Sequence, residues 1–232
     1  MTSAASGTLY VVSTPIGNLK DITQRALEVL GAVDMILAED TRHTSKLLFH
    51  FNINTPRISF HDYSTDKKML SLVAELEKGK NFALVSDCGT PLLSDPGYNL
   101  VRNSLAKGIT VIPIPGASAM LAAIVASGVP MDRFAFEGFL APKGSSRKER
   151  LAKFSGDDDI TRILYESPYH LVKLLEDLKG VLGAERPLVI GRELTKIHEE
   201  FLRGTVDEMI THFAKTEPRG EFVIIIPKEG RK

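Results

Sequence analysis

The chain has 232 residues, of which 43% are hydrophobic and 25% charged, an ordinary globular composition that excludes disordered and fibrous proteins. Lysine plus arginine and aspartate plus glutamate both total 29, so any nucleic-acid binding must come from a local basic patch. A single cysteine, Cys88, excludes an internal disulfide framework, and the sequence contains neither a membrane-spanning apolar run nor a signal-peptide pattern. We therefore expect a cytoplasmic protein with no membrane partner.

Short apolar runs alternate with helical patterns through the first half of the chain. Strands are predicted at 8–13, 35–38, 82–85 and 109–114, and helices at 23–30, 69–76 and 100–107. Asp21 or Thr23 is the expected N-cap of the first helix. Repeated strand–helix–strand units predict a mostly parallel sheet with helices on both faces.

The second half has a different pattern. A small-residue helix is predicted at 117–127, a basic helix with Ser146 and Glu149 spaced as a capping box, and strands at 163–165, 188–190, 201–206 and 222–226. The last three strands have little helical pattern between them, which predicts a mixed, partly antiparallel sheet. The proline-bracketed segment 113–116 is the expected boundary. The fold class is therefore α/β, with two α/β domains, 1–115 and 116–232, and a ligand cleft between them.

Polar or glycine-rich loops follow the predicted strands, where open α/β sheets bind ligands. They are 13–18, 38–44, 86–97, 115–119 and the pair 165–168 and 191–196. The loop at 86–97 is dense in Gly, Pro, Ser and Asp and can present backbone groups to a ligand, although a compact surface loop is the alternative. A cap at Asp40 would explain one residue of the second loop, but not Glu39, Arg42 and His43 together.

The chemistry available to these loops is limited. The histidines are scattered, so a metal site has poor support, and the chain has no dinucleotide fingerprint, P-loop or G-x-S-x-G elbow. Carboxylates and backbone carbonyls suit an ammonium and a ribose diol. A zwitterionic or cationic cofactor is therefore expected.

Eight motifs in chain order carry a family resemblance. They are Thr14-Pro15-Ile16-Gly17-Asn18-Leu19, Ala38-Glu39-Asp40-Thr41-Arg42, 86–97, Pro115-Gly116-Ala117-Ser118, Phe136-Glu137-Gly138-Phe139-Leu140, Tyr165-Glu166-Ser167-Pro168, Arg192-Glu193-Leu194-Thr195-Lys196 and Gly220-Glu221-Phe222. With them the sequence resembles the tetrapyrrole methylase superfamily, the class III S-adenosylmethionine-dependent methyltransferases. Within it, the resemblance is to the bacterial small-subunit (16S) ribosomal RNA cytidine 2′-O-methyltransferases.

The resemblance implies S-adenosyl-L-methionine in the cleft, a homodimer, and methylation of a ribose hydroxyl in the decoding region of the 30S subunit. Carried over by motif, the cofactor contacts would be Pro15, Gly89, Thr90, Leu93, Ser118, Ala119, Glu166 and Leu194. The sugar hydroxyl must lose a proton, which calls for a nearby base. Glu39, Asp40 and His43 are the candidates, and Lys196 is expected to steer a phosphate.

The strongest basic cluster is the candidate RNA contact, with a solvated helix face as the alternative. It consists of Lys143, Arg147, Lys148, Arg150 and Lys153. Two departures from the family pattern bear on RNA affinity and substrate contact. The sequence stops at Lys232, where members usually continue into a helical extension, and Tyr169-His170 stands where His-Arg is usual.

Two other functions remain open. One is methylation of a small tetrapyrrole or another non-RNA acceptor, against which the basic helix and the match to the RNA branch argue. The other is a non-catalytic, ribosome-associated nucleotide-binding module. Acidic and basic side chains at several strand ends favour an enzyme over this second alternative.

Overall fold

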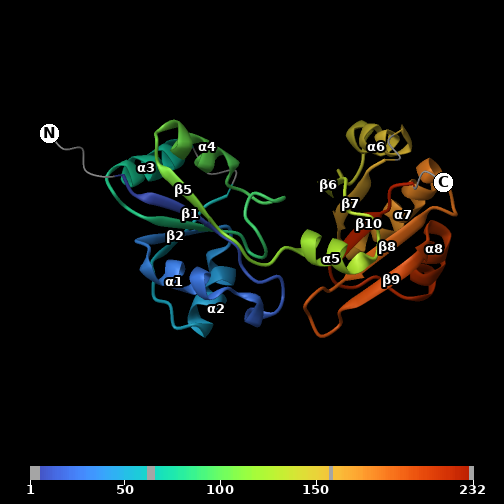
Figure 1. Ribbon diagram of the computed structural model, residues 1–232, viewed down its shortest axis with the longest axis horizontal. Helices are drawn as coiled ribbons and strands as arrows, with labels where there is room; N and C mark the ends of the chain where they lie inside the picture. The colour runs from blue at the N-terminus through green and yellow to red at the C-terminus, as the bar shows by residue number, and fades with distance from the viewer. Residues whose placement is uncertain (1–5, 62–65, 157–158, 230–232) are drawn as a thin grey trace. The chain divides into compact units, whose positions relative to one another are not determined.

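The computed structural model describes residues 6–61, 66–156 and 159–229, and its contacts divide the chain into two units, Met1–Ser118 and Ala119–Lys232. Each unit contains a five-stranded sheet with packed helices (Figure 1). Among the described residues, no helix has the length and apolar character needed to cross a membrane.

The first unit alternates strands and helices. Its elements are β1 (Thr8–Val12), η1 (Leu19–Asp21), α1 (Gln24–Ala32), β2 (Met35–Ala38), α2 (Thr41–His50), β3 (Arg57–Ser59), α3 (Asp66–Glu77), β4 (Phe82–Val85), α4 (Tyr98–Ala106) and β5 (Thr110–Ile114). The sheet order is β3-β2-β4-β1-β5, and every neighbouring pair is parallel. The predicted parallel sheet is confirmed.

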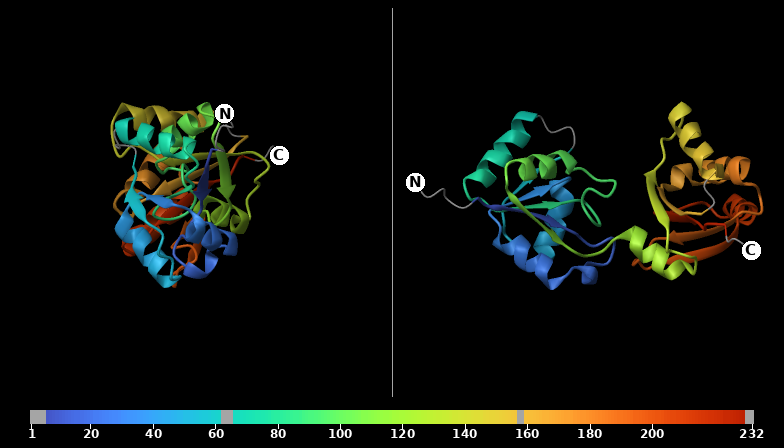
Figure 2. Two further views of the ribbon diagram at one scale, coloured as in Figure 1. Left: turned by 90° about the vertical axis from the view of Figure 1, so that its left-hand side faces the viewer. Right: turned by 45° about the horizontal axis from the view of Figure 1, so that its top comes forward.

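Helices cover both faces of this sheet, with α1 and α2 on one side and α3 and α4 on the other (Figures 1 and 2). Side chains alternate between the faces because successive strand residues point in opposite directions. Leu37 and Leu84 pack with Leu76 of α3, whereas Ile36 and Val85 belong to the cluster on the α1 and α2 side.

Two α-helices of this unit, α1 and α2, are capped by side chains at their starts. The Thr23 hydroxyl accepts a hydrogen bond from the Ala26 N–H at 3.1 Å, so Thr23 is the N-cap of α1. The Asp40 carboxylate accepts one from the Arg42 N–H at 2.8 Å at the start of α2. Such caps satisfy N–H groups that the helix itself cannot pair.

The second unit contains the mixed sheet. Its elements are α5 (Ala119–Ser127), β6 (Phe134–Phe139), α6 (Ser145–Ala152), η2 (Lys153–Gly156), β7 (Thr161–Glu166), α7 (Pro168–Leu182), β8 (Pro187–Arg192), β9 (Glu200–Thr205), α8 (Val206–Lys215) and β10 (Phe222–Ile226). The order is β6-β7-β10-β8-β9, in which β6 and β7 are parallel and the other pairs antiparallel. The predicted mixed sheet is confirmed.

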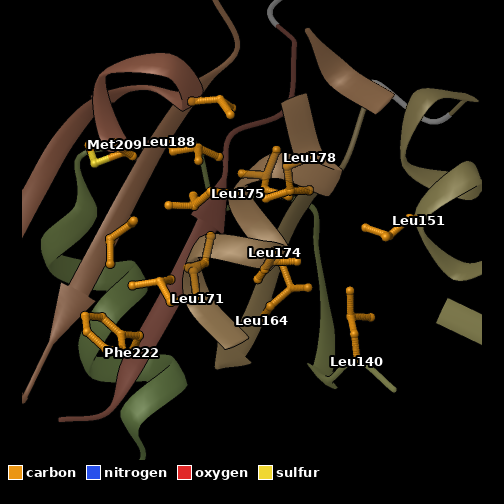
Figure 3. Close-up of a cluster of buried hydrophobic side chains, with 14 of the residues drawn as sticks. Leu140, Leu151, Leu164, Leu171, Leu174, Leu175, Leu178, Leu188, Met209 and Phe222 are labelled. Carbon is orange, nitrogen blue, oxygen red and sulfur yellow. The ribbon is translucent and has the colours of Figure 1, made fainter. Parts of the chain in front are cut away.

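Leucines of α7 form the centre of this unit's core (Figure 3). Leu171, Leu174, Leu175 and Leu178 recur at helical spacing on one face, and all four are fully buried. They pack in one cluster with strand residues such as Leu164 and Leu188, and with Met209 of α8. Truncating one of these leucines to alanine would cost about 2–5 kcal/mol.

Two expectations for the second unit are wrong. The basic helix α6 begins after Gly144 and has no side-chain cap, so Ser146 and Glu149 do not form a capping box. The last strands are not free of helix either, since α8 lies between β9 and β10. The capping box of this unit is Thr205 with Glu208, at the start of α8.

Candidate functional site

Loops that follow the strands of the first unit are joined at one edge of its sheet. Parallel strands place their carboxyl ends at the same edge, so the turn after β1 meets the long loop after β4. Thr14 and Gly89 form an isolated antiparallel bridge, with N–H···O distances of 2.8 and 3.1 Å. The Thr14 hydroxyl also donates to the Ser86 carbonyl at 3.3 Å.

Side chains extend this connection to the turn after β5. The hydroxyls of Ser13 and Thr90 lie 2.9 Å apart, and the Thr90 hydroxyl donates to the Ala117 carbonyl at 3.2 Å. Gly116 lies against Ser13 so closely that a Cβ at Gly116 would lie 2.9 Å from the Ser13 Cβ. Only glycine fits there without a shift of the neighbouring backbone.

The end of β2 is tied to the same loop. The Asp40 N–H donates to the Asp87 carboxylate at 3.0 Å. Four loops, after β1, β2, β4 and β5, are thus linked by hydrogen bonds within one unit. The sequence-predicted residues Pro15, Gly89, Thr90, Leu93 and Ser118 all lie on these loops.

The long loop after β4 holds non-glycine residues in the left-handed region. Leu92 and Ser94 both have φ of 71°. Such conformations cost on the order of 1–3 kcal/mol each and concentrate at ligand-binding and catalytic sites. The loop geometry therefore indicates a functional role.

A pocket of about 270 Å³ opens beside these loops. It is lined by Thr14, Pro15, Gly17, Leu19, His43, Thr44, Lys46, Leu47, Ser86 and Asp87. Thr44 is only 3% exposed, and its hydroxyl finds no hydrogen-bond partner within the described part of the chain. An unpaired buried hydroxyl is costly, so this wall of the pocket suits a ligand that can hydrogen-bond to it.

Two carboxylates at this edge have opposite electrostatic environments. The Arg42 side chain, 2.7 Å away, holds the pKa of the half-buried Asp40 carboxyl down to about 2, which leaves a weak base. Burial is the main cause that raises the pKa of Asp95 to about 6. The negative charges of Glu39 and Asp87 raise this pKa further, whereas a hydrogen bond from Ser86 lowers it. A group that titrates near 6 is better suited to accept a proton at neutral pH. Asp95 is not among the candidate bases that the sequence indicates.

The other candidate bases differ in exposure. His43 is exposed at the pocket wall, and Glu39 is half-buried at the end of β2. Ser118 is buried, and its hydroxyl has no partner among the described residues, so it does not cap α5 with a side-chain hydrogen bond.

The candidates of the second unit lie at the ends of β7 and β8. Glu166 is 5% exposed and accepts a hydrogen bond from the Ser167 N–H at 2.8 Å, and Leu194 is 6% exposed. Glu193 and Thr195, which flank Leu194, have left-handed φ values of 48° and 67°. This turn repeats the strained geometry of the loop after β4. Ala119, the first residue of α5, is half-buried.

Lys196 is held by two carboxylates. Its ammonium lies 2.7 Å from the Glu193 carboxylate and 2.9 Å from that of Glu221. Burial lowers the pKa of Lys196, but the hydrogen bonds to these two partners outweigh it and the net shift is upward. The ammonium is thus engaged in shaping the turn.

A known protein family matches most of the chain. Residues 8–210 match the family of tetrapyrrole (corrin/porphyrin) methylases. The chain belongs to this family. The resemblance that the eight motifs predicted is confirmed, and the chain is a methyltransferase.

Relatives named ribosomal RNA small subunit methyltransferase I match nearly the whole chain. One from Synechocystis sp. is 52% identical over 95% of this chain and 78% of its own length. Another from Escherichia coli O157:H7 is 49% identical over 98% of the chain and 79% of its own length. A relative from Thermotoga maritima is 46% identical over 95% of the chain and 98% of its own length.

Solved structures with the same fold are more distant in sequence. A diphthine synthase has a TM-score of 0.74 at 16% identity, covering 96% of this chain and 90% of its own. Uroporphyrin-III C-methyltransferase from Thermus thermophilus, complexed with S-adenosylhomocysteine, has a TM-score of 0.65 at 17% identity, covering 96% and 98%. These similarities confirm the methylase fold of two α/β parts.

In this methylase, fewer residues of the predicted basic cluster are available at the surface than the sequence indicates. Arg147 is 4% exposed, its Nε lies 2.8 Å from the Asp177 carboxylate, and its Nη1 donates to the Ala141 carbonyl at 3.1 Å. Arg147 is therefore an interior ion-pair partner, and its assignment to an RNA-binding surface is wrong. Arg150 is exposed but pairs with Glu137, while Lys143, Lys148 and Lys153 are exposed.

Proposed function

We propose that this chain transfers a methyl group from S-adenosyl-L-methionine to the 2′-hydroxyl of a cytidine in small-subunit ribosomal RNA. The observation that carries the proposal is identity of 46–52%, over about 95% of the chain, to relatives named for methylation of that RNA. Distant fold neighbours act on other acceptors by name, but their identity is below 20%.

The loops of the first unit fit this cofactor. Gly89 with its φ of 81° allows close backbone approach, and the buried Ser118 hydroxyl has no partner among the described residues. Pro15, Gly89, Thr90, Leu93 and Ser118 would hold the cofactor, with Ala119, Glu166 and Leu194 completing the set by family resemblance. The bound cofactor supplies an electrophilic methyl group on a sulfonium.

This chain's own residues must position the acceptor and remove its proton. Positioning supplies much of the rate in an in-line displacement. We add Asp95 to Glu39 and His43 as a candidate base, since its raised pKa matches the task. Asp40, with a pKa of about 2, is the weakest candidate.

The test is radiolabelled methyl transfer to small subunits from a strain that lacks the modification, followed by mapping of the labelled nucleotide. Label on the 2′-oxygen of a cytidine is expected. Label on a tetrapyrrole or a protein, or cofactor binding without transfer, would overturn the proposal in favour of another acceptor or a non-catalytic module.

Substitutions then assign the base. Asp95→Asn, Glu39→Gln and His43→Ala are compared at equal cofactor occupancy, and loss of the base lowers kcat by about 100-fold or more. Asp40→Asn is the matched control and retains most of the turnover. Near-normal kcat in all three variants would refute these assignments.

The protein would act in the cytoplasm as a homodimer, and sedimentation equilibrium tests the dimer. Lys143, Lys148, Arg150 and Lys153 remain the proposed phosphate-binding residues of α6 and its end. Neutralising the three lysines should flatten the salt dependence of RNA binding by about 0.7–0.9 in logarithmic slope for each phosphate that is no longer neutralised. An unchanged slope would remove α6 from the interface.

A further inference from the structure

The outer face of α2 has a one-sided charge pattern. No aspartate or glutamate occurs from Thr41 to His61, although the chain as a whole is neutral. From Thr41 to Arg57 the exposed cationic and imidazole side chains are Arg42, His43, Lys46, His50 and Arg57. Arg42 is paired with Asp40, so Lys46 of α2 and Arg57 of the neighbouring β3 supply the remaining positive charge.

Two hollows adjoin along this face. The pocket of about 270 Å³ at the strand ends shares Leu19 and Lys46 with an open hollow of about 740 Å³. The larger hollow is lined by Leu19, Ser45, Lys46, Phe49, His50, Asn52 and Arg57. Together they form a continuous track, here called the α2 track, on the helix labelled α2 in Figure 1.

An aromatic ring lines the larger hollow of the α2 track. Phe49 is 86% exposed, whereas its neighbours Leu47 and Leu48 are buried in the core. The Arg57 Nε donates to the Ser45 hydroxyl at 2.7 Å, which holds that guanidinium against the helix. Exposed aromatic rings flanked by cations are one means by which proteins bind single-stranded RNA, because bases stack on the rings and phosphates pair with the cations.

The end of the track offers a hydrogen bond. The Thr44 hydroxyl, buried and unpaired among the described residues, lies in the wall of the smaller pocket. A ribose or base edge could satisfy it. The track therefore combines stacking, charge and hydrogen bonding in one line.

We propose that the α2 track binds a single-stranded segment of RNA, with a base stacked on Phe49 and phosphates at Lys46 and Arg57, and delivers a nucleotide to the pocket at Thr44. The inference rests on the proposed function for the identity of the RNA. It adds a contact surface separate from α6. Charge complementarity favours RNA over a second copy of this chain, since a twofold contact would oppose like charges.

Fluorescence tests the stacking directly because the chain has no tryptophan. In the Phe49→Trp variant the indole reports on α2, and Tyr98→Trp, at a position 64% exposed on α4, is the matched control. Single-stranded oligocytidylate should quench the first variant and leave the second unchanged, with binding weakened by salt. A signal that changes with protein concentration but not with RNA indicates self-association and overturns the proposal, as does equal quenching of both variants.

Methyl transfer to unmodified small subunits gives the second readout. Phe49→Ala, Lys46→Gln and Arg57→Gln should each raise KM by about tenfold while cofactor binding by calorimetry is unchanged. Tyr98→Ala and the exposed α3 variant Lys67→Gln should match the unmodified protein. If the starting protein methylates subunits and all five variants have its KM, the proposal that the α2 track binds RNA is wrong.

If the unmodified protein transfers no methyl group to subunits, the proposed function fails instead. The fluorescence experiment still decides whether the α2 track binds RNA.

Discussion

The contact between Gly116 and Ser13 should control the geometry of the joined loops. In Gly116→Ala the new Cβ would lie 2.9 Å from the Ser13 Cβ and 3.4 Å from the Ser13 carbonyl oxygen. Carbon atoms in contact prefer about 3.5–4.0 Å, so at least half an ångström must be made up. The Ser13 Cβ has little freedom to retreat, because the Ser13 N–H is bonded to the Ile114 carbonyl and its hydroxyl to Thr90.

Overpacking of this kind costs about 1–3 kcal/mol, and we expect Gly116→Ala to lose about 2 kcal/mol of unfolding free energy. Urea unfolding followed by circular dichroism measures the loss. The control is Gly31→Ala in α1, where a Cβ meets nothing within 4 Å and better helix propensity should add about 0.5–1 kcal/mol.

A double variant separates this clash from other effects. Ser13→Gly removes the opposing Cβ. The double variant Ser13→Gly/Gly116→Ala should therefore lose less unfolding free energy than the two single variants lose together, by about 1 kcal/mol or more. Additive losses, or a Gly116→Ala protein as stable as the starting chain, would refute the steric reasoning.

Three further predictions concern charge and backbone strain. Burial raises the pKa of Asp95 to about 6 from an ordinary 3.8, so above pH 6 the folded protein carries a cost that is relieved as pH falls. Asp95→Asn should therefore gain about 1 kcal/mol near pH 8, after allowance for partial exposure, and almost nothing near pH 4, by urea unfolding; a gain independent of pH would contradict this. Asp177→Asn leaves the buried Arg147 charge without its carboxylate and should cost about 2–3 kcal/mol. Urea unfolding measures the loss, and an Asp177→Asn protein as stable as the starting chain would contradict the interior ion pair of Arg147. Ser94→Gly relieves a left-handed φ of 71° and should raise the thermal midpoint through about 0.5–1 kcal/mol of added stability; a lower midpoint would show that the hydroxyl matters more than the strain.

The parallel sheet is predictable because its strands are short apolar runs buried on both faces. β4 shows this most clearly, since all four of its residues are buried. In the second unit the helix α8 is harder to find, although Val206, Met209 and Phe213 have helical spacing and follow the Thr205–Glu208 capping box. The strand predicted at 201–206 includes Val206, which is the first residue of α8, so the prediction covers the start of the helix.

The candidate site is predictable where backbone chemistry is local. Glycine- and proline-rich loops at strand ends indicate the region that Thr14, Gly89 and Thr90 join. The wrong assignment of Arg147 arises because charge alone does not reveal burial, yet its position four residues before the buried Leu151 indicates the inner face of α6. Asp95 needs the structure, because its pKa depends first on burial and then on the charge of Glu39, which is distant in sequence.

Strand order in the first unit also bears on how the chain is made. β1 is synthesised before the other strands of this sheet, yet its neighbours in the sheet are β4 and β5. Leu9 therefore has no strand partner until Phe82 and Val111 have been synthesised. Pairing between such distant segments is slow because a long loop must close before any contact forms. During translation the apolar side chains of β1 therefore stay unpaired until β4 has emerged, and this interval is when the nascent protein depends most on protection from aggregation.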